Sequence, residues 1–155
     1  MKKETATFAA GCFWGVQAAF DGVKGVLSSA VGYMGGVDGK ITYELVCTGK
    51  TGHAEVVQVV FDSDVVTYKT LVEKFFTLHD PTQMNRQGPD VGTQYRSAVF
   101  YHTAAQKKIA ETVKNALMKK TGAKIVTEIS AAETFYSAED YHQKYLEKKG
   151  LKVCH

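Results

Sequence analysis

Apolar residues recur along the chain at two spacings, which predict strands and helices. Alternating or short continuous apolar runs predict strands at residues 5–9, 26–33, 54–62, 97–101 and 125–129. Helical spacing predicts helices at residues 14–20, 68–78, 104–120 and 138–148. The segment 54–62 gives the clearest strand pattern of the chain.

Glycines and prolines separate these elements. Loops are expected at residues 35–52, which are rich in glycine, and at residues 79–96, which hold both prolines. The second loop is too long to be idle in a compact domain, so we expect it to serve a site. The order of elements predicts an α+β fold. It would be a single-domain, ferredoxin-like layer sandwich with a central mixed β-sheet covered by helices.

Composition narrows the class of protein. The 155 residues are 45% hydrophobic and 23% charged with a net charge of +3, which is typical of a soluble globular protein. No long basic run is interleaved with aromatic residues, so we expect no nucleic-acid partner. No stretch approaches the about 20 apolar residues of a membrane span. The short apolar run near the N-terminus does not fit a signal peptide, so we expect a cytoplasmic protein.

The three cysteines, Cys12, Cys47 and Cys154, are odd in number and lack the spacing of zinc ligands. In a reducing compartment this favours reactivity or simple burial over structural disulfides. We therefore expect no metal and no cofactor.

Cys12 lies in the segment AAGCFWGVQAAF, where a helix is expected to begin. The unpaired N–H groups of a helix start favour thiolate over thiol, and Gly11 permits a tight turn that leaves the sulfur accessible. Cys12 is therefore a candidate nucleophile. The alternative is that Cys12 is simply a small, buried hydrophobic residue. Of the adjacent Phe13 and Trp14, at least one is expected to line the surroundings of the sulfur as an apolar wall.

Glu55 shares one face of the predicted strand 54–62 with Val57, Val59 and Phe61. Burial on this apolar face would raise its pKa, and a neutral carboxylic acid can donate a proton. The alternative is that Glu55, near the start of the strand, points into solvent.

Other polar residues are weaker candidates. Tyr43 and Tyr95 stand in glycine-flanked loops and could donate hydrogen bonds through their hydroxyls. His53, His79 and Asp90 could each pair with Cys12, and no spacing distinguishes among them.

Cys154 lies behind Gly150 in a segment, residues 149–155, that we expect to be a flexible tail on the single domain of residues 1–155. Such a tail could bring Cys154 onto the sulfur of Cys12 and resolve an oxidised form. Cys47 is interpreted as a buried structural cysteine.

These groups together suit a thioether sulfoxide, which has an electrophilic sulfur, a basic oxygen and a methyl group. Three other readings remain. A Cys–His peptidase or acyltransferase would need neither a protonated Glu55 nor Cys154 for its reaction. A thioredoxin-like oxidoreductase would need a second cysteine where Gly15 stands. A non-enzymatic module would use the aromatic residues to hold a peptide or single-stranded nucleic acid.

Gly11-Cys12-Phe13-Trp14-Gly15 resembles the active-site signature of the A-type peptide methionine sulfoxide reductases (MsrA family). Three further segments are similar to that family in its order: VGYMGG (31–36), TYELVCTGKTGHAEVV (42–57) and HDPTQMNRQGPDVGTQYRS (79–97). Four motifs in register make the resemblance specific, and it extends over nearly the whole chain.

The resemblance implies reduction of methionine-S-sulfoxide, free or in oxidised proteins, by a mixed-sheet α+β enzyme. Cys12 would be the nucleophile and Cys154 would resolve its sulfenic acid. Thioredoxin would then reduce the disulfide, and we expect a monomer.

The same resemblance implies roles for the residues around the sulfur, each at a matching position of this sequence. Phe13 and Trp14 would hold the substrate methyl group. The sulfoxide oxygen would be bound by Glu55, Tyr43 and Tyr95. Asp90 would support the site through a polar network.

Overall fold

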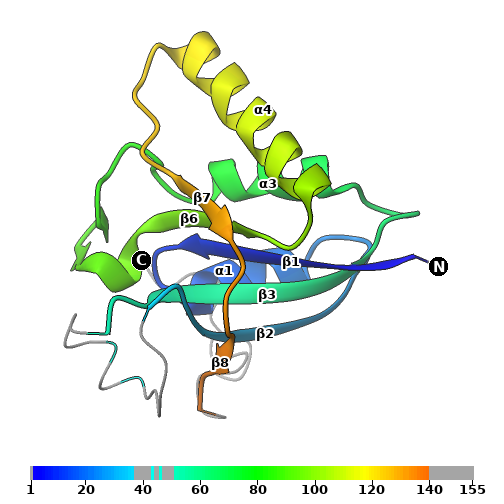
Figure 1. Ribbon diagram of the computed structural model, residues 1–155, viewed down its shortest axis with the longest axis horizontal. Helices are drawn as coiled ribbons and strands as arrows, with labels where there is room; N and C mark the ends of the chain where they lie inside the picture. The colour runs from blue at the N-terminus through cyan, green and yellow to red at the C-terminus, as the bar shows by residue number, and fades with distance from the viewer. Residues whose placement is uncertain (1, 37–42, 44–45, 47–50, 140–155) are drawn as a thin grey trace.

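A mixed β-sheet runs through the centre of the molecule. The computed structural model describes residues 2–36, 43, 46 and 51–139. Within them, six strands lie in the order β7-β6-β1-β3-β2-β8 (Figure 1). These strands are β1 (Lys3–Ala10), β2 (Val26–Met34), β3 (Ala54–Asp62), β6 (Ser97–Tyr101), β7 (Glu128–Ala131) and β8 (Tyr136–Ser137). The β6–β7 pair is parallel and the other pairs are antiparallel.

Both faces of the sheet are buried at its centre, where residues 6–10 of β1 and 54–57 of β3 are all buried. Alternate residues of β1, such as Phe8 and Ala9, belong to different apolar clusters on opposite faces. In β3, Val57 and Val59 face the larger cluster, and Val56 faces the smaller one.

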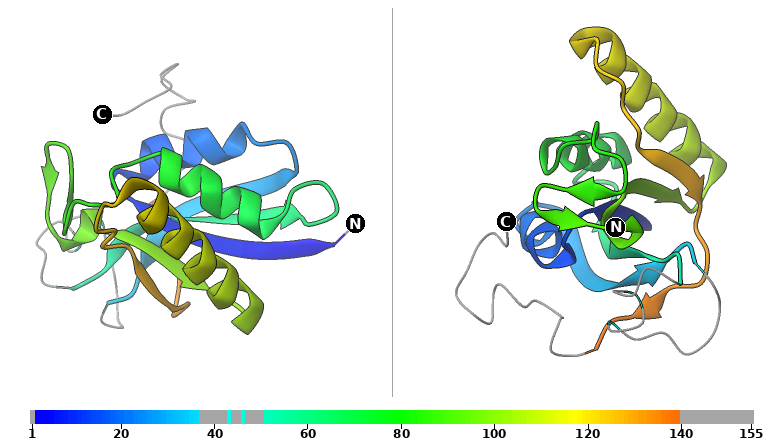
Figure 2. Two further views of the ribbon diagram at one scale, coloured as in Figure 1. Left: turned by 90° about the horizontal axis from the view of Figure 1, so that it is seen from above. Right: turned by 90° about the vertical axis from the view of Figure 1, so that its left-hand side faces the viewer.

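The helices α1 (Phe13–Asp21), α3 (Tyr68–Thr77) and α4 (Ala104–Thr121) pack against the larger cluster. Figure 2 shows that α1 and α3 lie over the same face of the sheet. The C-terminal end of α4 extends past the sheet. Threonine caps start two of these helices: Thr67 accepts a hydrogen bond from the Thr70 amide, and Thr103 accepts one from the Gln106 amide. The smaller cluster, on the other face, is covered by the segment that contains Ala132 and Phe135.

The expected α+β fold with a mixed central sheet is confirmed, but two element boundaries were wrong. The strand predicted at 125–129 is β7, at Glu128–Ala131. The preceding residues bond elsewhere, because the Val126 amide donates to the Pro81 carbonyl and the Thr127 hydroxyl pairs with Ser97. Of the helix predicted at 138–148, residues 138 and 139 are not helical, and the remainder lies outside the described residues.

The two predicted loops contain short stretches of regular secondary structure, which are too short to show a hydrophobic periodicity in the sequence. The 79–96 segment holds the hairpin of β4 (Arg86–Gln87) and β5 (Asp90–Val91) and the 3₁₀ turn η1 (Thr93–Tyr95). In the other segment, Tyr43 and Val46 have helical geometry.

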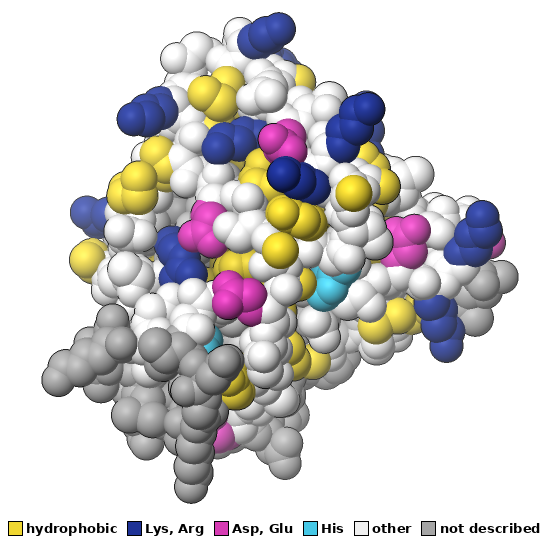
Figure 3. Space-filling model, viewed as in Figure 1, with side chains coloured by type: hydrophobic (Ala, Val, Ile, Leu, Met, Phe, Trp, Pro, Cys, Tyr) yellow, Lys and Arg dark blue, Asp and Glu magenta, His cyan; other side chains and the backbone are white. Residues whose placement is uncertain are grey.

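The surface charge is mixed where it can be seen. On the face shown in Figure 3, lysine and arginine side chains stand among acidic and apolar ones and form no continuous basic stripe. Within the described residues, none of the helices combines the length and the apolar composition that crossing a bilayer requires.

Gly11 makes the turn between β1 and α1. Its φ is +87°, a region that L side chains rarely adopt, and a Cβ there would lie 2.8 Å from Cβ and Cγ of Gln87. The turn therefore needs glycine for both its backbone angle and its contact with the Gln87 side chain.

We expect Gly11→Ala to lower the free energy of unfolding by about 2–5 kcal/mol, the sum of left-handed strain and overpacking. The matched control is Gly122→Ala at the end of α4, where φ is +71° but a Cβ would meet nothing within 4 Å. The control should lose only the strain, about 1–2 kcal/mol. Urea unfolding followed by circular dichroism measures both, and equal losses would contradict the packing role of Gly11.

Candidate active site

One small cavity, about 120 Å³ in volume, brings together side chains from four separate parts of the chain. Its lining matches the predicted site: Cys12, Phe13, Trp14, Tyr43, Glu55, Asp90 and Tyr95. These are all the predicted site residues except Cys154, which, like Cys47, lies outside the described residues. The roles predicted for them stay predictions.

Cys12 occupies the N-cap of α1, as the sequence predicts. β1 ends at Ala10, Gly11 turns the backbone, and the helix begins at Phe13. Cys12 is half-buried and lines the cavity, so its sulfur lies next to the positive end of a helix dipole and within reach of a small molecule. This environment favours the thiolate, the nucleophilic form of cysteine.

Phe13 anchors the aromatic side of the cavity. It is buried, and its ring lies 5.8 Å from that of Tyr33, 6.5 Å from that of Tyr43 and 6.5 Å from that of Trp14, measured between centroids. Trp14 is only partly buried. Both predicted rings therefore line the cavity, one fixed by the core and the other nearer to solvent.

Glu55 is the second residue of β3 and stands opposite Tyr33 of β2 in the sheet. It is 2% exposed, so the alternative of a solvent-facing Glu55 is wrong. Its Oε1 accepts a hydrogen bond of 3.3 Å from the Phe13 amide. The first amide of α1 and the carboxyl of β3 are thereby joined, which ties the helix start to the centre of the sheet.

Asp90 and Tyr95 reach the cavity from the 79–96 segment. Asp90 lies in β5 and pairs with Gln87 of β4, and Tyr95 ends the turn η1. The expectation that this long loop serves a site agrees with their position in the cavity lining.

Gln87 is a supporting residue that sequence reasoning missed. It is 5% exposed, accepts a hydrogen bond from the Asp80 amide at 2.9 Å, and donates one to the Asp80 carbonyl at 2.6 Å. Its aliphatic carbons face Gly11. No local pattern marks this glutamine, because its partners lie at the start of the loop and beside Cys12.

The turn at Asp80 is itself held by Thr82. Hydrogen bonds from the hydroxyl and amide of Thr82 keep the pKa of Asp80 below its usual range. The ionised carboxylate therefore stabilises the start of the loop that carries Gln87 and Asp90.

Of the three candidate partners for Cys12, only Asp90 lines the cavity. His79 donates through Nδ1 to the Phe75 carbonyl and pairs through Nε2 with the Ser97 hydroxyl at 2.6 Å. His53 is buried with its ring edge-on to Tyr136. Among the described residues no histidine lines the cavity. In the same part of the chain, no three His, Cys, Asp or Glu side chains group as metal ligands would.

Comparison with known proteins gives the same family over most of the chain. The family model for peptide methionine sulfoxide reductase matches residues 4–155. The peptide methionine sulfoxide reductase MsrA of Methanosarcina acetivorans is 60% identical over 150 residues, which cover 96% of this chain and 80% of that protein.

Solved structures agree with the sequence matches. Reduced Mxr1 from Saccharomyces cerevisiae superposes with a TM-score of 0.91 and 40% identity, covering 96% of this chain and 87% of that one. Mxr1 in complex with Trx2 superposes with a TM-score of 0.67 and 29% identity, covering 93% and 85%. Similarity of this extent in both sequence and structure establishes that the chain belongs to the peptide methionine sulfoxide reductase family.

Proposed function

We propose that Cys12 reduces methionine-S-sulfoxide, free or in oxidised proteins, within the cavity that it lines. The observation that carries this proposal is the meeting of a cysteine at a helix start, two aromatic rings and a buried carboxyl around one small cavity. The Cys12 thiolate attacks the sulfoxide sulfur and forms a bond between the two sulfur atoms, while the sulfoxide oxygen takes up one proton. The oxygen then passes to the Cys12 sulfur as the S–O bond of the substrate and the new S–S bond break. Methionine leaves, reduced by two electrons, and Cys12 is oxidised to a sulfenic acid.

Glu55 supplies the proton that this step requires. Attack on the sulfur drives negative charge onto the sulfoxide oxygen, so a donor at that oxygen lowers the barrier. Burial favours the neutral form of the Glu55 carboxyl. Because Oε1 accepts from the Phe13 amide, the transferable proton belongs on Oε2. Tyr43 and Tyr95 add hydrogen bonds to the same oxygen, and Asp90 supports them from the loop.

The aromatic residues select the reacting group. Phe13 and Trp14 form an apolar wall that suits the methyl group of the sulfoxide. With the methyl group and the oxygen both fixed, only one configuration at sulfur leaves the rest of the substrate free to exit. The S configuration follows from the family resemblance.

Recycling is assigned to the tail. The Cys154 thiol condenses with the Cys12 sulfenic acid, releases water and forms a disulfide. A thioredoxin then reduces this disulfide by thiol–disulfide exchange. Support comes from Mxr1, a relative of this chain whose structure has been solved in complex with Trx2. The protein is proposed to act as a monomer. It is proposed to work in the cytoplasm, whose reducing conditions suit three cysteines that lack the spacing of zinc ligands.

The direct test is incubation of the pure protein with methionine-S-sulfoxide and dithiothreitol. We expect methionine to be released, and Cys12→Ser to abolish release, because a serine hydroxyl is not ionised here and cannot be regenerated by thiols. Cys47→Ser is the matched control and should retain the activity. Substantial turnover by Cys12→Ser would remove Cys12 from its assigned role.

Glu55→Gln tests the origin of the proton. Glutamine keeps the shape of the side chain and a hydrogen-bond donor but has no transferable proton. We expect the rate of sulfenic acid formation to fall by at least about 10²-fold, the usual scale for a general acid. Single-turnover kinetics followed through Trp14 fluorescence measures this rate.

Tyr43→Phe and Tyr95→Phe serve as comparisons in the same assay. Each should cost less than Glu55→Gln, because the remaining donors still hold the oxygen. A Glu55→Gln protein that reacts within a few-fold of wild type would show that the proton comes from another group.

Cys154→Ser separates chemistry from recycling. Without external thiol we expect about one methionine per enzyme and a trapped sulfenic acid on Cys12, measured by mass spectrometry. Turnover with thioredoxin should collapse, whereas dithiothreitol should restore it. A Cys12–Cys47 disulfide in peptide maps of the oxidised wild type would instead refute the tail assignment.

A further inference from the structure

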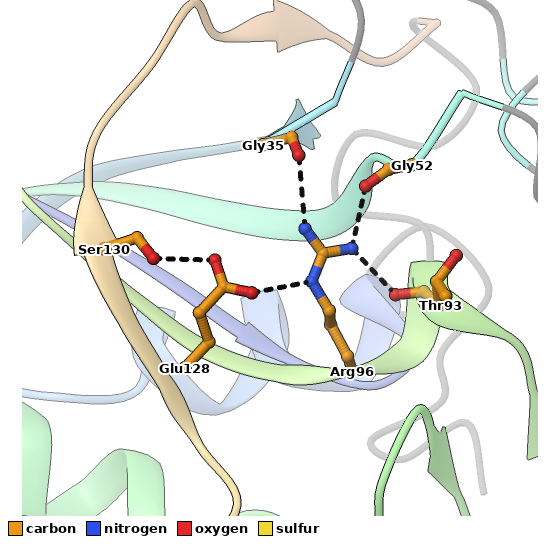
Figure 4. Close-up of polar contacts among 6 residues, drawn as sticks. All are labelled: Gly35, Gly52, Thr93, Arg96, Glu128 and Ser130. Carbon is orange, nitrogen blue, oxygen red and sulfur yellow. Dashed lines mark hydrogen bonds and ion pairs between the residues drawn. The ribbon is translucent and has the colours of Figure 1, made fainter.

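Arg96 follows Tyr95 directly and lies outside the lining of the cavity. Its guanidinium donates hydrogen bonds to three backbone carbonyls from three separate segments (Figure 4). Nη1 reaches the carbonyl oxygens of Gly52 at 2.9 Å and Thr93 at 3.0 Å, and Nη2 reaches that of Gly35 at 3.4 Å. The arginine thus links segments that lie far apart in the sequence.

Each of these carbonyls lies close along the chain to a part of the site. Gly35 directly follows β2, in which Tyr33 stands opposite Glu55 and packs against Phe13. Gly52 stands three residues before Glu55. Thr93 begins the turn η1 that ends at Tyr95. Arg96 therefore fixes the strand end opposite Glu55, the chain entering β3 and the turn that carries Tyr95.

The geometry needs a guanidinium. Carbonyl oxygens that converge on one point repel one another, and the planar fork of arginine meets several of them at fixed angles. The Arg96 side chain is only 14% exposed, so its charge requires compensation. Glu128 provides it through an ion pair of 3.2 Å with Nε, and Ser130 donates a hydrogen bond to the other carboxylate oxygen at 2.8 Å.

We propose that Arg96 is a positioning residue for sulfoxide reduction, which sets the places of Glu55 and Tyr95 by clamping the backbone around them. The inference rests on the proposed function, since it assigns those two residues to the sulfoxide oxygen. Arg96 acts through the donors and not through the aromatic wall. Its loss should therefore slow the chemical step more than it weakens substrate binding.

The experiment compares the two arginines of the chain in single-turnover assays over a range of methionine-S-sulfoxide concentrations. We expect Arg96→Ala to lower the limiting rate by about 10–10²-fold, as small displacements of catalytic groups do, with a change of less than about 3-fold in the half-saturating concentration. Arg96→Lys should recover only part of the loss, because an ammonium cannot form the planar fork.

Arg86→Ala is the matched control. Arg86 also donates to a backbone carbonyl, that of Gly88 at 2.6 Å, but it is exposed and joins residues of one hairpin only. Its limiting rate should stay within about 2-fold of wild type, the effect expected of an exposed contact.

Two further readouts separate positioning from a general loss of stability. Guanidinium ion at millimolar concentration should restore part of the rate of Arg96→Ala but not that of Arg96→Lys, where the lysine occupies the space. In addition, Arg96→Ala combined with Tyr95→Phe should lose less than the product of the two single losses, because Arg96 acts partly through Tyr95.

If Arg96→Ala does not fold, Arg96→Lys and Glu128→Gln are tested in its place, since Glu128→Gln removes the negative charge that pairs with the guanidinium. Limiting rates for Arg96→Lys and Glu128→Gln that match Arg86→Ala would overturn the inference while leaving the proposed function intact. A wild-type protein that releases no methionine would overturn the proposed function and the positioning role together.

Discussion

The antiparallel pairing of β1 with β3 is the interaction on which the site depends. In such a pair the end of one strand lies beside the start of the other. The ladder extends to Phe8 opposite Val57, so β1 ends and β3 begins at the same edge of the sheet. β1 leads from there into Gly11 and Cys12, and β3 begins with Ala54 and Glu55. A thiol and a carboxyl distant in sequence therefore lie at one edge, where the amide of Phe13, the residue after Cys12, donates a hydrogen bond to Glu55.

A buried carboxyl has an energetic cost, and the surrounding core offsets it. Removing a carboxyl from water is unfavourable unless it remains neutral or gains hydrogen bonds. Glu55 begins a strand face that continues with Val57, Val59 and Phe61, all fully buried in the larger cluster. These neighbours stabilise the strand through buried apolar surface and at the same time favour the uncharged acid. The same packing thus serves stability and the proposed proton transfer.

The loops at this edge of the sheet are held by side-chain hydrogen bonds in addition to the short β4–β5 ladder. Irregular backbone leaves amides and carbonyls that must find other partners when they are buried. Gln87 satisfies both backbone groups of Asp80, and Arg96 satisfies carbonyls of three segments. Two polar side chains outside the proposed chemistry therefore order the loops from which Asp90 and Tyr95 reach the cavity.

The sequence by itself determined the strands and helices with clear periods, the mixed α+β architecture, and Cys12 and Glu55 as central residues of the site. Tyr43, Tyr95 and Asp90, which also line the cavity, were assigned to the site by the family resemblance. Local chemistry sufficed for Cys12, because a glycine, a cysteine and an apolar helix are adjacent in the chain, and for Glu55, because strand alternation placed it on an apolar face. Only the tertiary structure decided the hairpin of β4 and β5, the shift of β7 to Glu128–Ala131, and the supporting roles of Gln87 and Arg96. Strands of two residues are too short to show an alternation of apolar and polar residues. The hydrogen bonds of Gln87 and Arg96 depend on backbone groups that come together only when the sheet has formed.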